Sequence, residues 1–312
     1  MHAELGCCRA PFLLAYSSSV ARTNCYGGLT KAMNENWLQH CATQAQLDFF
    51  NEQGYLIVEE ALSSDQVQRM TEAIDRIDAA ERAERGLEPH QTMAKFRTIV
   101  EDDLFLDLLD NEKVFPLAWD ILGWNIQHYI SHLIVYPPEP EGAEVNLGGW
   151  HQDGGRPVRE MERPHPRLSY KVSYWFSDTR PPNSGAMRII PGSHRFDEKP
   201  PQEVFDQPLH VEVAPGTAVL FDRRLWHARG LNTSEHTRKV IFIGYSYRWL
   251  RGLDYNNFPE EVLAKCDPIR RQLMGDGVDV KGWWQPTDAD VPLKTWIEAH
   301  RGKEHLVDIS GL

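Results

Sequence analysis

Residues 149–155, with the sequence GWHQDGG, decide how the rest of the chain is interpreted. Within them a histidine and a carboxylate stand two residues apart, followed by glycines that let the backbone turn away. Side chains at positions i and i+2 of an extended strand point to the same side, so His151 and Asp153 can both reach one metal ion. Two donors do not make a metal site, and a third ligand has to come from elsewhere in the chain.

A second histidine follows a predicted strand in residues 221–227 (FDRRLWH). Since this segment comes after a Pro-Gly turn and a strand, His227 is expected at a strand end, near the mouth of a sheet. Arg238 stands at the start of the next predicted strand, and residues 231–235 between them have the composition of a hairpin turn. If that turn centres on residues 232–233, the two side chains lie opposite each other across the hairpin and face one cavity.

Two histidines and one carboxylate on one face of a metal leave its other face open, the arrangement expected of non-haem Fe(II) oxygenases. The open positions can take a bidentate 2-oxo acid and then dioxygen. The far carboxylate of such a co-substrate needs a fixed planar cation, and the forked donors of arginine suit it better than the point charge of lysine. The four residues therefore predict an iron site with a 2-oxo acid anchored beside it.

The periodicity of the chain changes near residue 126, and this change predicts the fold class. Before it, helical patterns occupy residues 44–50, a helix that starts with a capping box at 63–66 and runs to about 85, and a pair between 104 and 122. After it, residues 126–136 alternate as a strand does and end at two prolines. Shorter strands are predicted at 169–176, 186–190, 210–213, 218–222 and 240–247. Helices followed by many short strands predict an α+β protein with a double-sheet jelly roll as its core.

The predicted domain covers residues 39–312, with a strand-rich core at about 126–250 and helices before and after it in the sequence. Residues 1–38 show neither helical nor strand periodicity and are predicted to form a poorly ordered tail. The sequence contains neither an internal repeat nor a linker between domains.

Together these motifs resemble the phytanoyl-CoA dioxygenase family. The resemblance rests on the metal motif at 151–153, the segments 184–187 (SGAM), 191–194 (PGSH) and 215–216 (PG), His227, and the eleven-residue step from there to Arg238. It implies a double-stranded β-helix (cupin-like) fold that uses Fe(II), 2-oxoglutarate and O2. Position by position, it implies that His151, Asp153 and His227 bind iron. It also implies that Arg238 holds the C5 carboxylate of 2-oxoglutarate.

The same resemblance suggests three further contacts to 2-oxoglutarate, from Lys95, His132 and Tyr174. His132 and Tyr174 lie on predicted strands that can face the cavity, whereas Lys95 falls in a segment without a clear pattern. His128 and His132 are predicted two pleats apart on one face of a strand, so they are not expected to share a metal.

Composition and charge narrow the classes of partner. The 312 residues are 41% hydrophobic and 25% charged, as in an ordinary globular protein, and the net charge is -12. That charge argues against non-specific nucleic-acid binding and against an electrostatic membrane anchor. Apolar runs fall short of the roughly 20 residues that cross a bilayer. Five cysteines are odd in number and predict no disulfide framework, so we expect a cytoplasmic protein. We also expect a monomer or homodimer that acts on a small molecule.

The sequence therefore predicts an Fe(II)- and 2-oxoglutarate-dependent dioxygenase that hydroxylates an unactivated C–H bond of a small organic molecule, with release of succinate and CO2. Asp153 disfavours halogenation, because the related halogenases carry a small residue in place of this carboxylate. Desaturation and ring formation use the same iron site and stay open. The alternatives are a cupin-like metal-dependent hydrolase or isomerase, which would not need Arg238, and a non-catalytic binding protein, which would not need all three ligands. The sequence does not select a primary substrate.

Overall fold

The computed structural model describes residues 35–142, 149–154, 160–196, 198–255, 257–277, 281–283 and 285–306, all within one compact unit, residues 34–312. Of the predicted tail, residues 1–38, the first 34 lie outside the described residues and the last four are described. Residues 35–40 form the 3-10 helix η1 (Glu35–His40), in which Trp37 is only 2% exposed. Its indole packs edge-on against the rings of Phe115 and Trp296, at centroid distances of 5.2 and 5.1 Å. Because a buried tryptophan contributes a large apolar area, residues 35–38 pack with the domain predicted for residues 39–312.

The first two long helices follow the predicted signals. α1 (Gln44–Gln53) and α2 (Ser64–Arg85) begin with capping boxes at Thr43 and Ser63, and α1 ends at Gly54, whose positive φ suits glycine. The remaining helices are η2 (Thr98–Val100), α3 (Asp103–Leu106), α4 (Phe115–Leu122), η3 (Ser193–Arg195), α6 (Gln202–Phe205), α7 (Glu260–Leu263), α8 (Pro268–Leu273), α9 (Pro292–Arg301) and η4 (Lys303–His305). None of the described helices combines the length and the apolar character needed to cross a bilayer.

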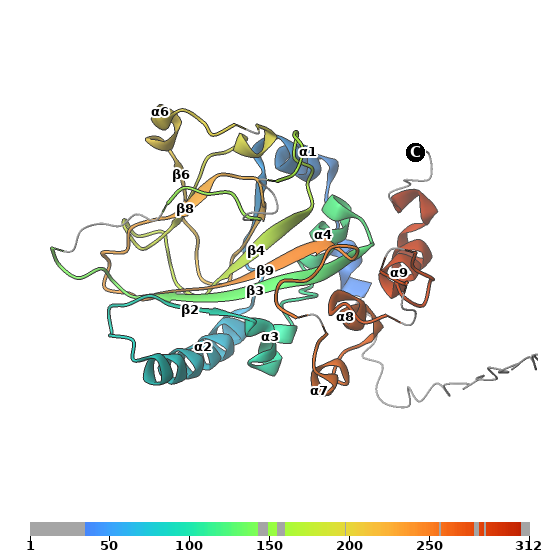
Figure 1. The fold of residues 1–312 in the computed structure, drawn as a ribbon, viewed down its shortest axis with the longest axis horizontal. Coiled ribbons are helices and arrows are strands. Elements are labelled where there is room, and N and C mark those ends of the chain that lie inside the picture. Colours follow the sequence, from blue (N-terminus) through green and yellow to red (C-terminus); the bar gives the residue numbers. More distant parts are fainter. Residues whose placement is uncertain are drawn as a thin grey trace, which may run out of the picture. The chain divides into compact units, whose positions relative to one another are not determined.

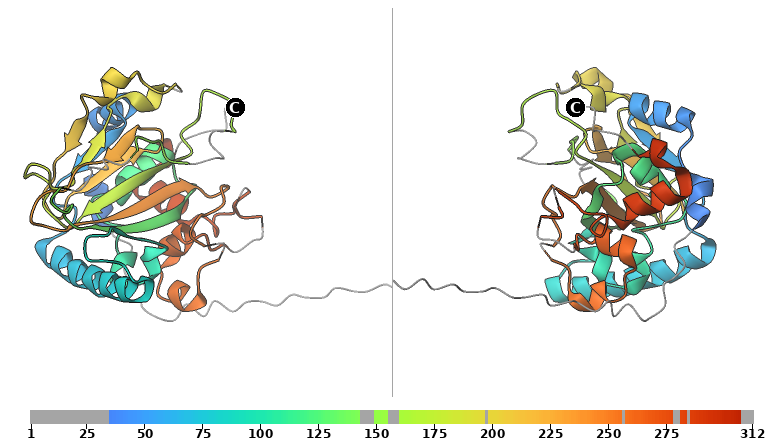
Figure 2. Two further views of the ribbon diagram at one scale, coloured as in Figure 1. Left: turned by 60° about the vertical axis from the view of Figure 1, so that its left-hand side comes forward. Right: turned by 90° about the vertical axis from the view of Figure 1, so that its right-hand side faces the viewer.

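Two antiparallel sheets make the jelly roll. The strands are β1 (Tyr55–Val58), β2 (Met93–Phe96), β3 (Ile126–Tyr136), β4 (Ser169–Trp175), β5 (Met187–Ile189), β6 (Leu209–Val211), β7 (Ala218–Asp222), β8 (His227–Arg229) and β9 (Arg238–Tyr247). The large sheet has the order β1-β7-β4-β9-β3-β2 and the small sheet the order β6-β5-β8. Figure 1 shows α2 and α3 on one side of the large sheet and β6 and β8 on the other. In the right-hand view of Figure 2, α9 and α8 cover the same sheet together with α4.

Alternation along the strands divides the large sheet into two faces. In β4, Tyr170 and Tyr174 belong to the apolar core shared with the helices, which we call the helix-covered face. Trp175 belongs to the second core, shared with the small sheet, which we call the inner face. Lys171 follows Tyr170 by one residue and so lies on the inner face as well. Side chains of the large sheet that reach the space between the sheets come from this face.

A β-bulge in β3 separates two histidines that the sequence placed on one face. His128 lies opposite Tyr245 of β9 and Ile130 opposite the next residue, so one extra residue is inserted at this point. His128 therefore faces the helix-covered side, where its Nε2 lies 3.4 Å from Asp254, while His132 faces inward. The prediction of a shared face is wrong, because a bulge reverses the alternation.

The predicted hairpin between His227 and Arg238 is also wrong. β8 pairs with β5 in the small sheet, whereas β9 pairs with β3 and β4 in the large sheet. Residues 230–237 therefore cross from one sheet to the other. The side-chain amide of Asn232 fixes this crossing by donating to the carbonyls of Tyr136 and His236, both at 3.0 Å. The side chains of His227 and Arg238 thus enter the space between the sheets from opposite sheets.

Candidate metal centre

His151, Asp153 and His227 come together on the inner side of the small sheet. One ligand atom of each lies within 4.8 Å of the others, a spacing that can hold a metal ion. His151 forms an antiparallel bridge with His227 through backbone hydrogen bonds of 3.1 and 3.0 Å. The backbone N–H of Asp153 donates to the carbonyl of Arg223 at 2.8 Å, which fixes the position of the carboxylate. His227 is buried and His151 is exposed, so the cluster is anchored in the protein and open to solvent on one side.

Backbone carbonyls orient both imidazoles. The Nδ1 of His151 lies 3.0 Å from the carbonyl of Gly149, and the Nδ1 of His227 lies 2.9 Å from that of Leu225. A carbonyl can only accept, so in each ring Nδ1 carries the proton and Nε2 keeps its lone pair for a metal. Burial lowers the pKa of His227 to about 4, which keeps the ring neutral near pH 7. Both histidines therefore present the form that metals bind.

The carboxylate of Asp153 lies beside a lysine. The Nζ of Lys171 is 2.9 Å from its Oδ2, and the Nε2 of His227 is 3.8 Å from the same oxygen. Burial by itself would raise the pKa of Asp153, but the charge and hydrogen bond of Lys171, together with the neighbouring His227 and His151, outweigh it and hold that pKa below the ordinary range. Asp153 is consequently an anion, as a metal ligand must be.

Arg238 is a buried cation on the inner face. Its guanidinium is packed between the rings of Tyr136 and Trp175, 5.3 and 5.6 Å from their centroids, and Nη1 donates to the carbonyl of Gly185 at 3.1 Å. A Cβ at position 185 would lie 2.9 Å from the Arg238 side chain, which explains a glycine there. Burial lowers the pKa of Arg238 to about 10, and Nε has no hydrogen-bond partner. Within the described residues no carboxylate forms an ion pair with it, so the site is suited to an anionic ligand.

His132 lies where the sequence placed it, on the inner face. Its ring stacks on Phe96 at 4.1 Å, and its buried Nε2 has no hydrogen-bond partner. Burial, followed by the charge of Lys171, lowers its pKa to about 4, with Arg238 acting in the same direction. A neutral imidazole with a free nitrogen is therefore available between the two cations.

Tyr174 and Lys95 lie on the helix-covered face, away from the three donors. The hydroxyl of Tyr174 donates to the carbonyl of Leu108 at 3.0 Å, and the Nζ of Lys95 pairs with Glu81 at 2.7 Å. Both groups are satisfied there. Neither side chain reaches the space between the sheets, because each stands at the outward-facing step of its strand, so the structure does not support the predicted contacts to 2-oxoglutarate.

Three inner-face residues close to the cluster were not predicted as site residues: Lys171, Arg223 and Tyr129. Lys171 could have been found from the sequence as a charged residue inside a buried strand. Arg223 lies in the segment before His227, but it was not predicted to take part in the site. Tyr129 could not have been found, because the bulge in β3 is what turns it inward.

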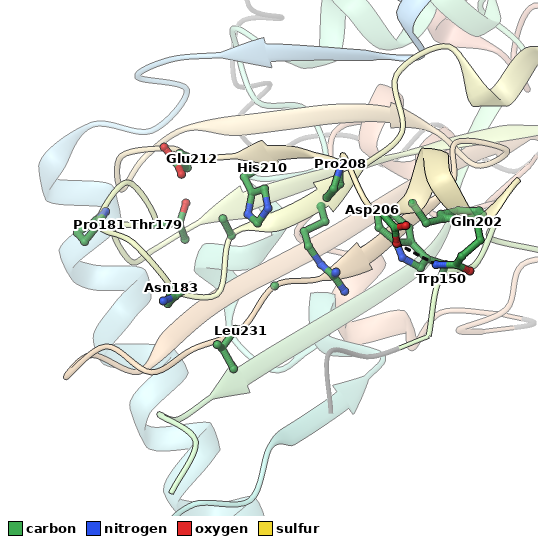
Figure 3. Close-up of a pocket in the computed structure, with 14 residues that line it drawn as sticks. Trp150, Thr179, Pro181, Asn183, Gln202, Asp206, Pro208, His210, Glu212 and Leu231 are labelled. Atoms are coloured by element: carbon green, nitrogen blue, oxygen red, sulfur yellow. Dashed lines mark hydrogen bonds between the residues drawn. The ribbon is translucent and has the colours of Figure 1, made fainter. Parts of the chain in front are cut away.

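A cavity of about 580 Å³ opens on the other face of the small sheet (Figure 3). Arg188 and His210 line it, and Trp150 does so as well, with its ring 4.9 Å from the Arg188 guanidinium. Trp150 directly precedes His151, and neighbouring residues of an extended chain point to opposite faces. The sheet therefore separates this cavity from the metal centre.

The sequence model of the phytanoyl-CoA dioxygenase family matches residues 50–240. The chain belongs to this family. An uncharacterized protein of Mycobacterium tuberculosis is 26% identical over 241 residues, 73% of this chain and 85% of that protein. A probable alpha-ketoglutarate-dependent hypophosphite dioxygenase of Stutzerimonas stutzeri is 26% identical over 227 residues, 62% of this chain and 75% of that protein. The crystal structure of HygX from Streptomyces hygroscopicus, with nickel and 2-oxoglutarate bound, superposes with a TM-score of 0.55 at 16% identity. The match covers 70% of this chain and 91% of HygX, and it confirms the fold.

As a member of the phytanoyl-CoA dioxygenase family, the protein is a non-haem Fe(II)- and 2-oxoglutarate-dependent dioxygenase with the predicted cupin-like fold. The residues present fit these groups. The donor set of two imidazoles and one carboxylate suits Fe(II) and leaves coordination positions open. A buried guanidinium without a carboxylate partner suits one end of a dicarboxylate.

Proposed function

We propose that His151, Asp153 and His227 bind the iron and that the enzyme hydroxylates an unactivated C–H bond of a small organic molecule. We also propose that Arg238 binds the C5 carboxylate of 2-oxoglutarate. The observation that carries the proposal is the combination of a three-donor cluster on the small sheet with an unpaired guanidinium on the large sheet.

The iron, when bound, couples decarboxylation of 2-oxoglutarate by dioxygen, which yields succinate and CO2, to oxidation of the substrate. The protein supplies orientation and charge. The carbonyls of Gly149 and Leu225 hold the two imidazoles with Nε2 toward the ligand side. Arg238 is held rigid by two aromatic rings and the carbonyl of Gly185, so little freedom is lost when it binds a carboxylate.

His132 is proposed as a further contact to 2-oxoglutarate. It interacts electrostatically with both Asp153 and Arg238, and the co-substrate has to span the same interval, from the metal to the guanidinium. Its neutral ring offers Nε2 as a hydrogen-bonding atom without adding charge.

The alternatives are less well supported. A cupin-like hydrolase or isomerase would leave Arg238 buried without a counter-charge, since its described contacts are two aromatic rings and one carbonyl. Halogenation requires a halide in place of the carboxylate ligand, and Asp153 occupies that position in the cluster.

A cytoplasmic location is proposed as well. Cys41 and Cys266, the cysteines among the described residues, are free thiols, which fits a reducing compartment. We propose a monomer or homodimer that acts on a small molecule. Gel filtration of the purified protein at several concentrations tests the oligomeric state directly.

The experiment that tests the proposed function follows both products. Protein supplied with Fe(II), ascorbate and 2-oxoglutarate under air is expected to release succinate. A panel of small molecules is then screened by mass for the addition of one oxygen atom derived from 18O2. His227→Ala should abolish both signals. Succinate release that is unchanged in this variant would contradict the ligand assignment.

A further inference from the structure

Two cations flank Asp153 on the inner face of the large sheet. Lys171 of β4 forms the ion pair already described, and the carbonyl of Arg223, just after β7, accepts the backbone N–H of Asp153 at 2.8 Å. Lys171 lies directly opposite Phe221, an inner-face residue. Arg223 stands in the turn just after β7, and its guanidinium is close enough to Asp153 and Tyr129 to interact electrostatically with both. Both therefore belong to the metal centre rather than to the surrounding scaffold.

Arg223 has hydrogen-bonding capacity that the described protein does not use. The residue is 2% exposed; its Nη2 donates to the carbonyl of Pro166 at 2.7 Å, while Nε and Nη1 have no partner. The adjacent Asp222 does not serve it, because that carboxylate is bound by Arg224 and Arg167. A buried guanidinium with two unsatisfied nitrogens is costly unless a ligand satisfies them.

The formal charges of the loaded site leave these two cations uncompensated. A divalent ion, Asp153, Arg238 and the dianion of 2-oxoglutarate sum to zero. Lys171 and Arg223 then add two positive charges. Among the described residues, the sole carboxylate that forms an ion pair with either is Asp153, which is already counted. The loaded site is therefore suited to an additional anion.

Tyr129 adds a neutral donor beside Lys171. The bulge turns its ring over Gly244, where a Cβ would lie 2.3 Å from the ring, and Gly244 is the cross-strand neighbour of Lys171. Burial raises the pKa of Tyr129, so its hydroxyl stays protonated and able to donate.

From this arrangement we infer that the primary substrate carries an anionic group, a carboxylate or phosphonate, which binds Lys171 and Arg223 with the Tyr129 hydroxyl as a further donor. The inference rests on the proposed function, because the charge count assumes iron and 2-oxoglutarate in the site. It adds a substrate class: small organic anions rather than neutral or cationic molecules.

The surroundings of the cations favour an apolar, flat body attached to that anion. The ring of Phe242 lies 5.9 Å from the Nζ of Lys171, and the ring of His132 lies 6.3 Å from that of Phe242. His132 in turn stacks on Phe96, which is 56% exposed at the edge of the sheet. These three rings form a continuous row from solvent to Lys171.

The test uses the protein loaded with Fe(II) and 2-oxoglutarate under anaerobic conditions, with benzoate, phenylphosphonate and benzamide as probes. The three share a phenyl ring and differ in charge, so their dissociation constants, measured by calorimetry, isolate the anion. We expect at least one anion to bind about 10-fold or more tightly than benzamide, as one charge-assisted hydrogen bond would give. Tighter binding of benzoate identifies a carboxylate site, and tighter binding of phenylphosphonate a phosphonate site. Equal binding of all three probes would overturn the inference.

Variants of Lys171 and Arg223 test whether these two cations cause the preference for anionic probes. Arg223→Gln and Lys171→Met should each reduce it to within about 3-fold of benzamide, whereas Arg223→Lys should keep most of it. Lys239→Met is the matched control, since it removes a lysine from the helix-covered face of the same sheet. A preference that survives in both neutral variants would contradict the assignment.

Failure of this inference is distinguishable from failure of the proposed function. Each variant is first checked for folding by thermal melting and for binding of metal and 2-oxoglutarate. Arg223→Gln is the decisive variant, because its side chain has no ion pair with Asp153, while Lys171→Met also changes the surroundings of that ligand. If the wild-type protein binds neither metal nor 2-oxoglutarate, the proposed function is wrong. If it binds both but shows no anion preference, this inference alone is wrong.

Discussion

The two faces of the large sheet treat buried charge differently. On the helix-covered face, Lys95 and Lys239 each have a carboxylate partner, at 2.7 and 2.6 Å. On the inner face, Arg238 and Arg223 have no such partner among the described residues, and each keeps at least one unsatisfied nitrogen. One sheet thus pairs both of these lysines on one side. On the other side it pairs Lys171 with Asp153 and leaves two arginines without a carboxylate among the described residues.

This difference separates residues that hold the fold from residues available to ligands. A buried charge without a partner is destabilising by several kcal/mol, so a sheet serving stability alone would pair both sets. The pairing on the helix-covered face shows that the sequence can supply carboxylates where they are needed. The two unpaired arginines on the inner face lie on the side of the His151–Asp153–His227 cluster, which is what we expect if they bind ligands.

Removal of the carboxylate ligand should have the largest effect. In Asp153→Ala we expect metal affinity to fall by more than about 100-fold, because even partners of a ligand are worth roughly 10–100-fold. Turnover should disappear with it. Equilibrium dialysis with Fe(II) under anaerobic conditions measures the affinity. Asp178→Ala, which removes a carboxylate paired with an exposed arginine, serves as the control and should bind iron normally.

Acid should destabilise the inner face next most strongly. His132 and His227 have pKa values of about 4 in the folded protein against an ordinary value of 6.5. The unfolded chain therefore takes up protons between pH 6.5 and 4 while the folded chain does not, so stability is full above this window and falls as the pH drops through it. Across this window each histidine lowers the free energy of unfolding by on the order of 3 kcal/mol.

Denaturant unfolding of the metal-free protein at pH 7.5 and pH 4.5 measures this loss. His132→Gln should remove one histidine's share of it, and His90→Gln, at an exposed position, should remove none. A loss of stability that is the same in all three proteins would show that the buried histidine is not its source.

Arg238 and Lys239 are consecutive cations on opposite faces of β9, which makes them a direct comparison. Arg238→Gln should weaken 2-oxoglutarate binding by about 10–100-fold, the value of one charged hydrogen-bond pair, with little change in metal affinity. Lys239→Met should leave 2-oxoglutarate binding unchanged and reduce stability by no more than about 1 kcal/mol. Calorimetric titration of 2-oxoglutarate into both metal-loaded variants measures the two affinities. Equal affinities would contradict the distinction between the two faces.

The smallest effect is expected at Tyr174, on the helix-covered face. Tyr174→Phe should cost about 1 kcal/mol of stability, because the carbonyl of Leu108 loses the closer of its two donors and keeps only the Tyr245 hydroxyl at 3.5 Å. The affinity for 2-oxoglutarate should stay at the wild-type value. A fall in that affinity together with normal stability would return Tyr174 to the site.

Much of the fold was predictable because its signals are local. The strand at 126–136 and the one at 218–222 match β3 and β7 in both bounds, since alternation and flanking prolines act within a few residues. The grouping of His151 with Asp153 was predictable for the same reason: a two-residue step in an extended chain determines on which side both side chains lie.

What could not be predicted depends on contacts distant in the sequence. Asp254 accepts from the backbone and hydroxyl of Ser131, and these bonds lie beside the bulge that reverses the direction of His128. No pattern near residue 128 contains that information. The faces of β4 were ambiguous because nearly all of its residues are buried, so hydrophobic alternation does not distinguish Tyr174 from Lys171.

The most direct test of the central claim measures how strongly metal binding and 2-oxoglutarate binding are coupled. The affinity for 2-oxoglutarate is determined anaerobically in the presence and in the absence of Fe(II). If the three ligands and Arg238 form one site, the metal should raise the wild-type affinity by about 10-fold or more, and 2-oxoglutarate should raise metal affinity by the same factor. Asp153→Ala should remove this coupling. Equal 2-oxoglutarate affinity with and without Fe(II), or full coupling in Asp153→Ala, would contradict the account.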